Sequence, residues 1–207
     1  MKKLMVAVLG VLFLAPAAFA DGWGLGVKLG AAENDPKTIK DIYHDSTAAS
    51  SEKDEGPGFG GIEALYEWDM NDESTKLGVK LGLEGYGENK VELKSSPLYL
   101  EVKETTVALP LTVYYKRDNG IKNWSFYGGA GATWMYSELE AKGTLNQKEH
   151  KGKLFPHINL GAEYRFTKLF ALGLDARYNF SAKIKKDGDV LSDRSGFGAA
   201  ITGRFYF

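Results

Sequence analysis

The sequence predicts an all-β fold, an eight-stranded antiparallel up-and-down β-barrel that spans a membrane as a transmembrane barrel. Three observations predict it. Apolar and polar residues alternate strictly over residues 170–180, which gives a strand with one oily and one charged face. Seven further segments follow the same period of two. The connections between the eight segments are alternately long and short, as they are in barrels whose strands cross a bilayer.

The N-terminal segment, residues 1–20, is predicted to be a secretory signal peptide. Two lysines at positions 2 and 3 precede an apolar stretch over 4–14, and Ala18-Phe-Ala20 matches a cleavage site of the A-x-A type. The apolar stretch is too short to cross a bilayer as a helix, which takes about 20 apolar residues. We therefore expect the mature chain to be one domain over residues 21–207.

The composition argues against several classes of protein. The 207 residues include no cysteine, so we expect no disulfide framework, no thiolate metal site and no lipid anchor on cysteine. The formal net charge is −1 and the basic residues are scattered, which argues against nucleic acid as a partner. Beyond residue 20 no apolar run is long enough for a transmembrane helix. Membrane strands are not detected by average hydropathy, because their apolar and polar residues alternate.

The first four predicted strands lie near 22–32, 58–68, 76–84 and 106–116. In each of them apolar residues alternate with glycine or with polar and charged residues. The apolar sides are Trp23, Leu25, Val27, Leu29 and Ala31 in the first, Ile62, Ala64, Tyr66 and Trp68 in the second, Leu77, Val79, Leu81 and Leu83 in the third, and Val107, Leu109, Leu111, Val113 and Tyr115 in the fourth.

The last four predicted strands lie near 124–136, 157–166, 170–180 and 197–207. Their apolar sides are Trp124, Phe126, Ala130, Ala132, Trp134 and Tyr136 in the fifth, Ile158, Leu160, Ala162, Tyr164 and Phe166 in the sixth, Phe170, Leu172, Leu174, Ala176, Tyr178 and Phe180 in the seventh, and Phe197, Ala199, Ile201, Phe205 and Phe207 in the eighth. A tilted membrane strand needs about 9 to 11 residues, and an even number of strands can close into a barrel.

The connections predict the orientation of the barrel. They fall near 33–57, 69–74, 88–103, 117–123, 141–153, 167–169 and 181–194. Long outer loops and short periplasmic turns are typical of barrels in bacterial outer membranes, so we expect both termini in the periplasm. Aromatic residues gather near both ends of the strands, as amphipathic rings do at membrane–water interfaces. The expected location is the cell outer membrane of a Gram-negative-type cell.

The polar sides of the strands are predicted to face the interior, which eight strands leave just wide enough for side chains to fill. The charged residues on these sides are Lys28, Lys76, Lys80, Lys116, Arg165, Arg177 and Arg204, with Glu63, Glu67, Glu84, Glu104, Glu163 and Asp175. Because unpaired buried charges are costly, this balance predicts a paired network that plugs the barrel. We expect the network to contain Lys28, Glu63, Lys80, Glu84, Glu163, Arg165, Asp175, Arg177 and Arg204.

Glycines on the same sides, Gly26 and Gly131 among them, allow two interpretations. They either leave room for long lysine and arginine side chains or mark bends where a small barrel curves tightly.

Three stretches and the last residue resemble a known family. They are VALPLTVYYK (107–116), WSFYGGAGATWMY (124–136), HINLGAEYRFTKLFALGLDARYNF (157–180) and the terminal Phe207. The family is the superfamily of small eight-stranded outer-membrane β-barrels, of the OmpA, OmpX and Ail type, with the generic outer-membrane protein β-barrel domain. The resemblance implies insertion by the barrel assembly machinery, which reads the C-terminal aromatic residue. It implies no particular activity, because the superfamily includes structural proteins, adhesins, narrow channels and a few lipid-modifying enzymes.

One long connection predicts a contact surface. Residues 91–103 predict two short strands around a Ser-Ser-Pro turn, which would extend the third and fourth strands into a protruding hairpin. The hairpin either offers an exposed edge for β-augmentation by another protein or is stiff and inert. The apolar phase changes between Val102 and Val107, which predicts a bulge near 104–106.

The connection over 141–153 is basic. Its lysines are Lys142, Lys148, Lys151 and Lys153, with Glu149 as the acidic residue. These lysines pair with the acidic connection over 33–57 and close the barrel mouth, meet the phosphates of lipopolysaccharide, or are simply solvated.

The histidines test an enzymatic interpretation. His44-Asp-Ser46 has the His-x-Ser pattern of a lipid A deacylase of this fold, but it lies in the long first connection and not on a membrane strand. His157 is expected at the inner wall near Glu163, and His150 in solvent. Because no carboxylate stands at ligand spacing from them, we predict no metal site, no cofactor and no catalytic residue.

These observations predict an integral outer-membrane protein with a polar, plugged interior that serves as a structural or adhesin-like surface-interaction protein and not as an enzyme. The alternatives are a narrow porin-like channel, a lipid A-modifying enzyme, and a soluble carrier of the lipocalin kind that buries its oily face. The expected partners are outer-membrane lipid and lipopolysaccharide, the barrel assembly machinery, and an extracellular protein bound through the loops. We expect a monomer.

Overall fold

A computed structural model of the protein describes residues 22–33, 50–54, 58–70, 74–87, 89–95, 98–143, 147–186 and 189–207. These residues form twelve strands, and no helix occurs among them. Within this part of the chain, no helix is present that could cross a membrane. The predicted signal peptide over residues 1–20 and the His44-Asp-Ser46 pattern lie outside the described residues.

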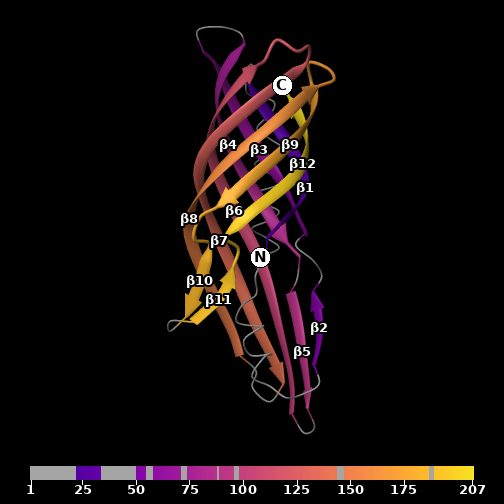
Figure 1. Ribbon diagram of the computed structural model, residues 1–207, viewed down its shortest axis with the longest axis vertical. Coiled ribbons are helices and arrows are strands. Elements are labelled where there is room, and N and C mark those ends of the chain that lie inside the picture. Colours follow the sequence, from indigo (N-terminus) through magenta and orange to yellow (C-terminus); the bar gives the residue numbers. More distant parts are fainter. Residues whose placement is uncertain are drawn as a thin grey trace.

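Eight strands close into an antiparallel barrel (Figure 1). They are β1 (Trp23–Ala32), β3 (Gly58–Asp69), β4 (Thr75–Tyr86), β6 (Leu98–Asp118), β7 (Trp124–Gly143), β8 (Gln147–Arg165), β9 (Phe170–Asn179) and β12 (Gly196–Tyr206). Each pairs with the next in this order, and β12 pairs back with β1. Closure gives every backbone group in the wall a partner, which strands need in order to cross lipid. The predicted fold class is confirmed.

Three strands are longer than the sequence predicts. β6, β7 and β8 contain 21, 20 and 19 residues, whereas a membrane strand needs about 9 to 11. Their extra lengths, with β5 (Asn89–Ser95) and β2 (Ser50–Asp54), form a projecting sheet in the order β2, β5, β6, β7, β8. Figure 1 shows this sheet extending below the barrel, together with a separate hairpin of β10 (Lys183–Lys186) and β11 (Asp189–Asp193).

The barrel therefore has two different ends. The turn end carries the short connections β3–β4, β6–β7 and β8–β9, and the sheet end carries the projecting sheet and the β10–β11 hairpin. The last strand ends at the turn end, where the N–H of Phe207 donates to the carbonyl of Trp23 at 2.9 Å.

The strand register shows an irregularity where a bulge was predicted near 104–106, on the partner side of β6. β6 pairs with β7 without a break from Leu100 and Gly143 to Asp118 and Ser125. On its other side β6 pairs first with β4 and then with β5, and an offset of one residue falls between those two strands. The change of apolar phase in β6 lies opposite this offset, so the extra residue stands on the side of β4 and β5 and not in β6 itself.

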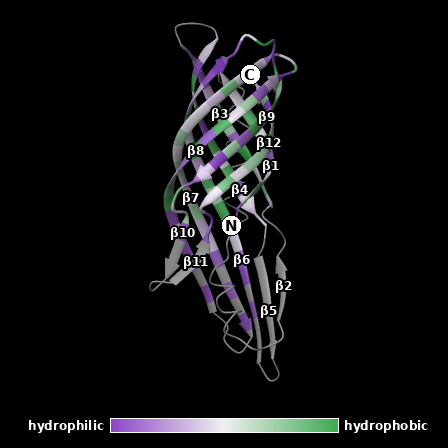
Figure 2. Cartoon of the chain, viewed as in Figure 1, coloured by the Kyte–Doolittle hydropathy of each residue, from purple (hydrophilic) through white to green (hydrophobic). Residues whose placement is uncertain are grey.

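The apolar side of the barrel faces outward. Leu29 is 74% exposed, Leu174 59% and Ile201 60%, whereas Arg204, on the opposite side of β12 from Ile201, is 2% exposed. Figure 2 shows hydrophobic and hydrophilic residues alternating along β9 and β12. The predicted sidedness is confirmed, and it excludes a soluble carrier, whose apolar side would line the interior.

Candidate functional site

The nine residues predicted for the interior network come from six strands. They are Lys28 on β1, Glu63 on β3, Lys80 and Glu84 on β4, Glu163 and Arg165 on β8, Asp175 and Arg177 on β9, and Arg204 on β12. All occupy inward positions of their strands, because successive side chains of a strand point to opposite faces. Eight of the nine side chains are at most 11% exposed, and Arg165 is 33% exposed.

Arg204 brings three carboxylates together in the middle of the barrel. Its Nε donates to Glu63 Oε1 at 2.7 Å, its Nη1 to Glu163 Oε2 at 3.0 Å and its Nη2 to Asp175 Oδ2 at 2.8 Å. The hydroxyl of Thr202 also donates to Asp175 Oδ2, at 2.7 Å. Because a guanidinium presents five donors in a rigid fork, one arginine can hold carboxylates from three strands.

A second arginine lies nearer the sheet end. Arg177 donates from Nη1 and Nη2 to the two carboxylate oxygens of Glu84 at 2.8 and 2.7 Å. Lys28 Nζ lies 2.7 Å from Glu84 Oε1 and 3.5 Å from Glu63 Oε2. Lys28 thus links the group around Arg177 to the group around Arg204, and the bidentate pair fixes the orientation of both side chains.

Lys80 fills the space beside these groups. Its Nζ donates to Asp175 Oδ1 at 2.8 Å and to Asn159 Oδ1 at 3.2 Å. The same ammonium lies 5.2 Å from the ring centre of Tyr127, a distance at which a cation is attracted to an aromatic face.

Lys116 carries the contacts toward the turn end. Its Nζ donates to Glu163 Oε1 at 2.7 Å and to Glu67 Oε1 at 3.1 Å. Two tyrosine hydroxyls join the same carboxylates, Tyr206 donating to Glu163 Oε2 at 2.6 Å and Tyr114 to Glu67 Oε1 at 2.9 Å. Each of these carboxylates therefore has both a cation and a hydroxyl as partners.

Arg165 is the most peripheral member of the predicted network. Its Nη2 lies 3.5 Å from Glu163 Oε1, and its guanidinium stacks 4.4 Å from the ring centre of Tyr206. Lys76, also on an inward side, lies at the turn end and pairs with Asp69 at 3.1 Å. Ion pairs that are partly exposed contribute little to stability.

The contacts run as one chain along the barrel. The chain passes through Glu67, Lys116, Glu163, Arg204, Glu63, Lys28, Glu84 and Arg177. Between these side chains lies a cavity of about 30 Å³, lined by Lys28, Lys80, Glu84, Asp175 and Arg177 among others. A cavity of this size holds about one water molecule.

One inner glycine fills the first of the two roles that the sequence left open, and another allows a close approach of two strands. A Cβ at Gly26 would lie 2.9 Å from Glu63 Cγ and 3.3 Å from Arg204 Cγ, so this glycine leaves room for the network. A Cβ at Gly131 would lie 2.8 Å from Thr112 Cα, so that glycine lets the backbones of β6 and β7 approach closely.

A third arginine, which sequence reasoning missed, lies at the sheet end. Arg194, between β11 and β12, is 3% exposed. Its Nη2 donates to Thr106 Oγ1 at 3.3 Å and lies 3.8 Å from Glu104 Oε2, and its guanidinium is 4.7 Å from the ring centre of Tyr86. The sequence places it in a connection, where no periodicity indicates which side chain turns inward.

The corner before β12 is held by side chains of the β10–β11 hairpin. Asp193 Oδ1 accepts the N–H of Ser195 at 3.1 Å, and its Oδ2 lies 3.3 Å from Lys183 Nζ. Burial disfavours the charged carboxylate, but the hydrogen bonds with Ser195 and Lys183 outweigh burial and lower the pKa of Asp193. Lys153 on β8 donates to the carbonyl oxygens of Ser181 and Lys183, both at 2.9 Å.

His157 lies inside the barrel, but not beside Glu163 as predicted. Its Nε2 and Nδ1 lie 2.9 Å from the hydroxyls of Thr112 and Thr133. The prediction was wrong because the two residues share a face of β8 but are separated along it by about 20 Å, at about 3.3 Å per residue. His150 is exposed and stacks on Tyr136 at 5.8 Å between ring centres. In the described part of the chain, no group of His, Asp and Glu is placed to hold a metal ion.

The projecting sheet leaves a different edge open from the one predicted. Over 91–103 the described residues 91–95 belong to β5 and 98–103 to β6, and the two strands pair with each other. β2 covers the far side of β5, and β7 covers the far side of β6, so neither is an edge. β8 pairs with β9 only from His157 onward, and over 147–155 the described residues pair it with β7 alone.

The lysines of the predicted basic connection lie on β7 and β8, and two of them have acidic neighbours. Lys142 Nζ lies 3.4 Å from Glu140 Oε2, and Lys148 Nζ lies 2.6 Å from Glu138 Oε1. The side chain of Lys151 is exposed. Pairing with carboxylates of β7 lowers the positive charge that this surface can offer to a phosphate.

Comparisons with solved structures place this fold among bacterial outer-membrane barrels. The chain is similar to OprG of Pseudomonas aeruginosa, at 14% identity and a TM-score of 0.52, over 90% of this chain and 97% of that one. It is similar to Ail, the attachment invasion locus protein of Yersinia pestis, at 12% identity and a TM-score of 0.51, over 90% and 99%. It is also similar to neisserial surface protein A, at 15% identity and a TM-score of 0.50, over 90% and 97%. At these identities the likeness concerns the fold.

The search of curated proteins finds no match to this sequence. The family model described as outer membrane protein beta-barrel domain matches residues 4–205, which is nearly the whole chain. This match agrees with the closed ring of eight strands, its apolar outer wall and its polar interior. The chain belongs to the outer membrane protein beta-barrel domain family and is a protein of the Gram-negative outer membrane.

Proposed function

We propose that the protein is a structural and surface-interaction protein, not an enzyme, whose barrel is plugged by its ion pairs and whose projecting sheet contacts an extracellular protein. The observation that carries the proposal is the length of β6, β7 and β8, which have 21, 20 and 19 residues. About 9 to 11 residues cross the bilayer, so roughly half of each strand is available for contact outside it.

The interior supports the plug. The contact chain from Glu67 to Arg177 links residues of seven barrel strands, and the cavity between its members measures about 30 Å³. Small barrels of eight strands are filled by side chains, and a hydrated ion needs far more space than one water molecule.

The open edge of β8 supports a contact by β-augmentation. The N–H of Phe180 donates to the carbonyl of Pro156 at 3.0 Å, so the backbone groups of Pro156 face away from β7. Since these directions alternate along a strand, the backbone groups of His150 and Gly152 also face away from β7. An extended segment of another protein could add to this edge by main-chain hydrogen bonds.

The orientation is part of the proposal. The sheet end faces the cell exterior, among lipopolysaccharide, and the turn end with both termini faces the periplasm, as the alternation of long and short connections favours. The barrel assembly machinery inserts the chain and reads Phe207, which is 47% exposed at the turn end. The protein works as a monomer.

A pull-down from intact cells tests the proposal. Lys90 and Lys103 face each other across the β5–β6 hairpin, so residues 91–102 can be replaced by an Asn-Gly turn that joins them. We expect the natural protein to capture an extracellular protein and the shortened variant to capture at least tenfold less, because β2 and β5 lose their places in the sheet.

The control is the folded state of the barrel, measured by circular dichroism and by resistance to protease. Capture of the same proteins in the same amounts by both forms would remove β2, β5 and the outer part of β6 from the contact and leave β7 and β8. No capture by the natural protein would overturn the surface-interaction role itself.

A further inference from the structure

Each of the three short connections at the turn end has an exposed long apolar side chain among its described residues. Met70 after β3 is 48% exposed, Ile121 after β6 is 61% exposed and Leu169 before β9 is 62% exposed. A single exposed apolar residue on a soluble surface needs no explanation. Three of them at one end of a membrane barrel indicate that this end meets a surface that is partly apolar.

Two of these turns are held rigidly. The N–H of Ile121 donates to Asn119 Oδ1 at 3.0 Å, and the carbonyl of Ile121 accepts the N–H of Trp124 at 3.0 Å. In the other turn, Thr167 Oγ1 accepts the N–H of Leu169 at 3.2 Å. These hydrogen bonds fix the backbone from which Ile121 and Leu169 project.

A backbone hydrogen bond joins the two turns. The N–H of Arg165 donates to the carbonyl of Asn123 at 2.9 Å, so the β6–β7 and β8–β9 turns form one surface. We call this surface the basic rim, formed by residues 117–123 and 165–169.

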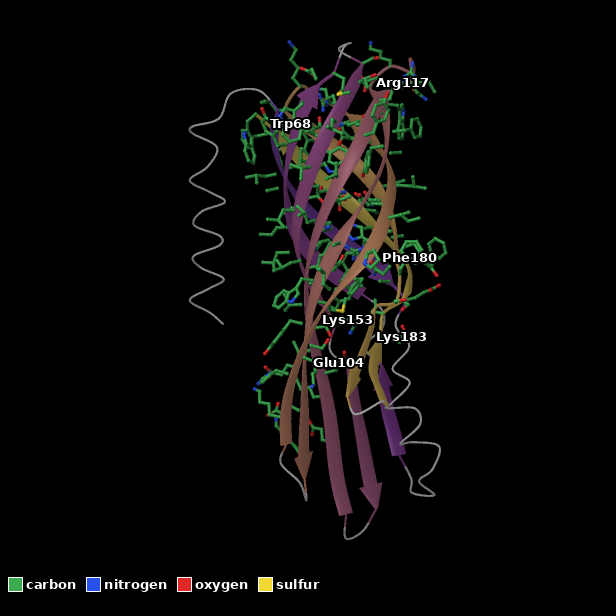
Figure 3. The ribbon with its side chains drawn as sticks, turned by 90° about the vertical axis from the view of Figure 1, so that its left-hand side faces the viewer. Trp68, Glu104, Arg117, Lys153, Phe180 and Lys183 are labelled. Carbon is green, nitrogen blue, oxygen red and sulfur yellow. The ribbon has the colours of Figure 1, made fainter. Side chains whose placement is uncertain are left out.

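The charge of the basic rim is positive. Its exposed cations are Arg117, Lys122 and Lys168, and its exposed anion is Asp118. Arg117 lies at the turn end, as does Trp68 (Figure 3). On the β3–β4 side the corresponding cation, Lys76, is paired with Asp69 at 3.1 Å. Positive charge therefore gathers on the side of the turn end that β6 to β9 form.

Aromatic residues lie beside the rim on the outer wall. Trp124 and Tyr164 pack with their ring centres 5.2 Å apart, and Tyr164 and Phe166 with theirs 4.8 Å apart. Such rings settle at the level of the lipid headgroups, so the turns next to them lie among the headgroups themselves.

We infer that the basic rim binds the headgroups of anionic phospholipids in the leaflet that surrounds it. Arg117, Lys122 and Lys168 contact the phosphates, while Ile121 and Leu169 insert between the uppermost parts of the acyl chains. A basic residue close to an anionic membrane surface contributes about fivefold to association. This inference goes beyond the proposed function, since it concerns the end of the barrel away from the projecting sheet.

Quenching of tryptophan fluorescence by brominated lipids tests the inference. One form of the protein keeps Trp124 beside the rim, with Trp23, Trp68 and Trp134 changed to phenylalanine. It is reconstituted in phosphatidylcholine that contains either brominated phosphatidylglycerol or brominated phosphatidylcholine. We expect brominated phosphatidylglycerol to associate around Trp124 several-fold more strongly, and the R117Q/K122Q/K168Q form to lose most of this preference.

Two controls make the outcome specific. A form that keeps Trp134, which lies on β7 toward the sheet end, should show the same quenching by both lipids. In the Trp124 form, K151Q removes an exposed lysine of the other end and should change nothing. Equal quenching of Trp124 by both lipids in the form with an intact rim would overturn the inference. An unchanged preference for brominated phosphatidylglycerol in the R117Q/K122Q/K168Q form would overturn it as well. Both results leave the surface-interaction proposal intact, because capture of a protein partner is measured separately.

Discussion

Arg204 holds more interior carboxylates than any other side chain described. Its three nitrogens donate to Glu63, Glu163 and Asp175 over 2.7 to 3.0 Å. These carboxylates come from β3, β8 and β9, so one guanidinium connects the two sides of the barrel. A lysine could not replace it, because an ammonium lacks the planar fork.

We expect R204M to lower the free energy of unfolding by about 3–5 kcal/mol, because it leaves buried carboxylates without their main partner. The matched control is R165M, which removes the same group from a side chain that is 33% exposed and 3.5 Å from Glu163. Its expected cost is below about 1 kcal/mol. Equilibrium unfolding by urea in lipid vesicles measures both. Equal losses would contradict the central role of Arg204.

At the residue scale, alternation along the strands could predict which charges face inward but not which charges meet. Lys28 and Glu84 come from strands that are not neighbours in the barrel, yet their charged atoms lie 2.7 Å apart. Their contact depends on height along the barrel axis, which follows from the stagger between strands. His157 shows the same limit, since its partners Thr112 and Thr133 lie on the two preceding strands.

At the scale of the element, β8 combines two kinds of strand. From His157 onward it is an inner strand of the wall with partners on both sides, and over 147–155 it is paired with β7 alone. The charged and small residues of this part suit a solvated edge, because charge hinders pairing with a second copy of the chain.

We expect H150P to abolish capture of an extracellular partner and H150A to preserve it. The backbone N–H of His150 faces the open edge, so proline removes a donor for β-augmentation but leaves the bonds to β7 in place. Alanine removes the imidazole and its contacts with Tyr136 and Glu138 but keeps the donor. Pull-down from intact cells measures the two variants side by side. Equal capture by both would show that the partner does not add to this edge.

The positions of the membrane strands could be predicted from the sequence, but their lengths could not. The strand predicted near 124–136 continues to Gly143 as part of β7. A segment beyond the bilayer is part of a long strand if it pairs with another segment, and it is a loop if it does not. The pairing partner lies far away in the sequence, so the residues of one segment do not predict the pairing. The covered edge of β5 escaped prediction for the same reason, because β2 lies in a connection.

At the scale of the whole molecule, three arginines lie at successive levels of the interior. Arg204 lies in the middle with three carboxylates, Arg177 lies nearer the sheet end with Glu84, and Arg194 lies at the sheet end near Glu104. The levels are linked through Lys28 and through Tyr86, whose ring lies 4.7 Å from Arg194.

We expect the natural protein to show no steady openings in a planar bilayer, since each level blocks the same path. R177A together with E84A removes one level of the network. The barrel of this variant should also stay closed, because the level of Arg204 remains. Adding R204A and E63A should produce steady conductance. Large steady openings of the natural protein would reject the plug in favour of the narrow channel. A closed quadruple variant would show that other side chains fill the interior.

The order of amino acids is enough to predict eight alternating strands with an oily outer side and a charged inner side. These properties depend on the period of two within a single strand and on whether a side chain faces lipid or the polar interior. Both are properties of each strand taken alone. Four features became visible in the folded barrel alone: which charges pair, how far β6, β7 and β8 project, the inward turn of Arg194 and the open edge of β8. Each of those depends on the stagger and the order of strands around the ring, and both are set by contacts between residues that lie far apart along the chain.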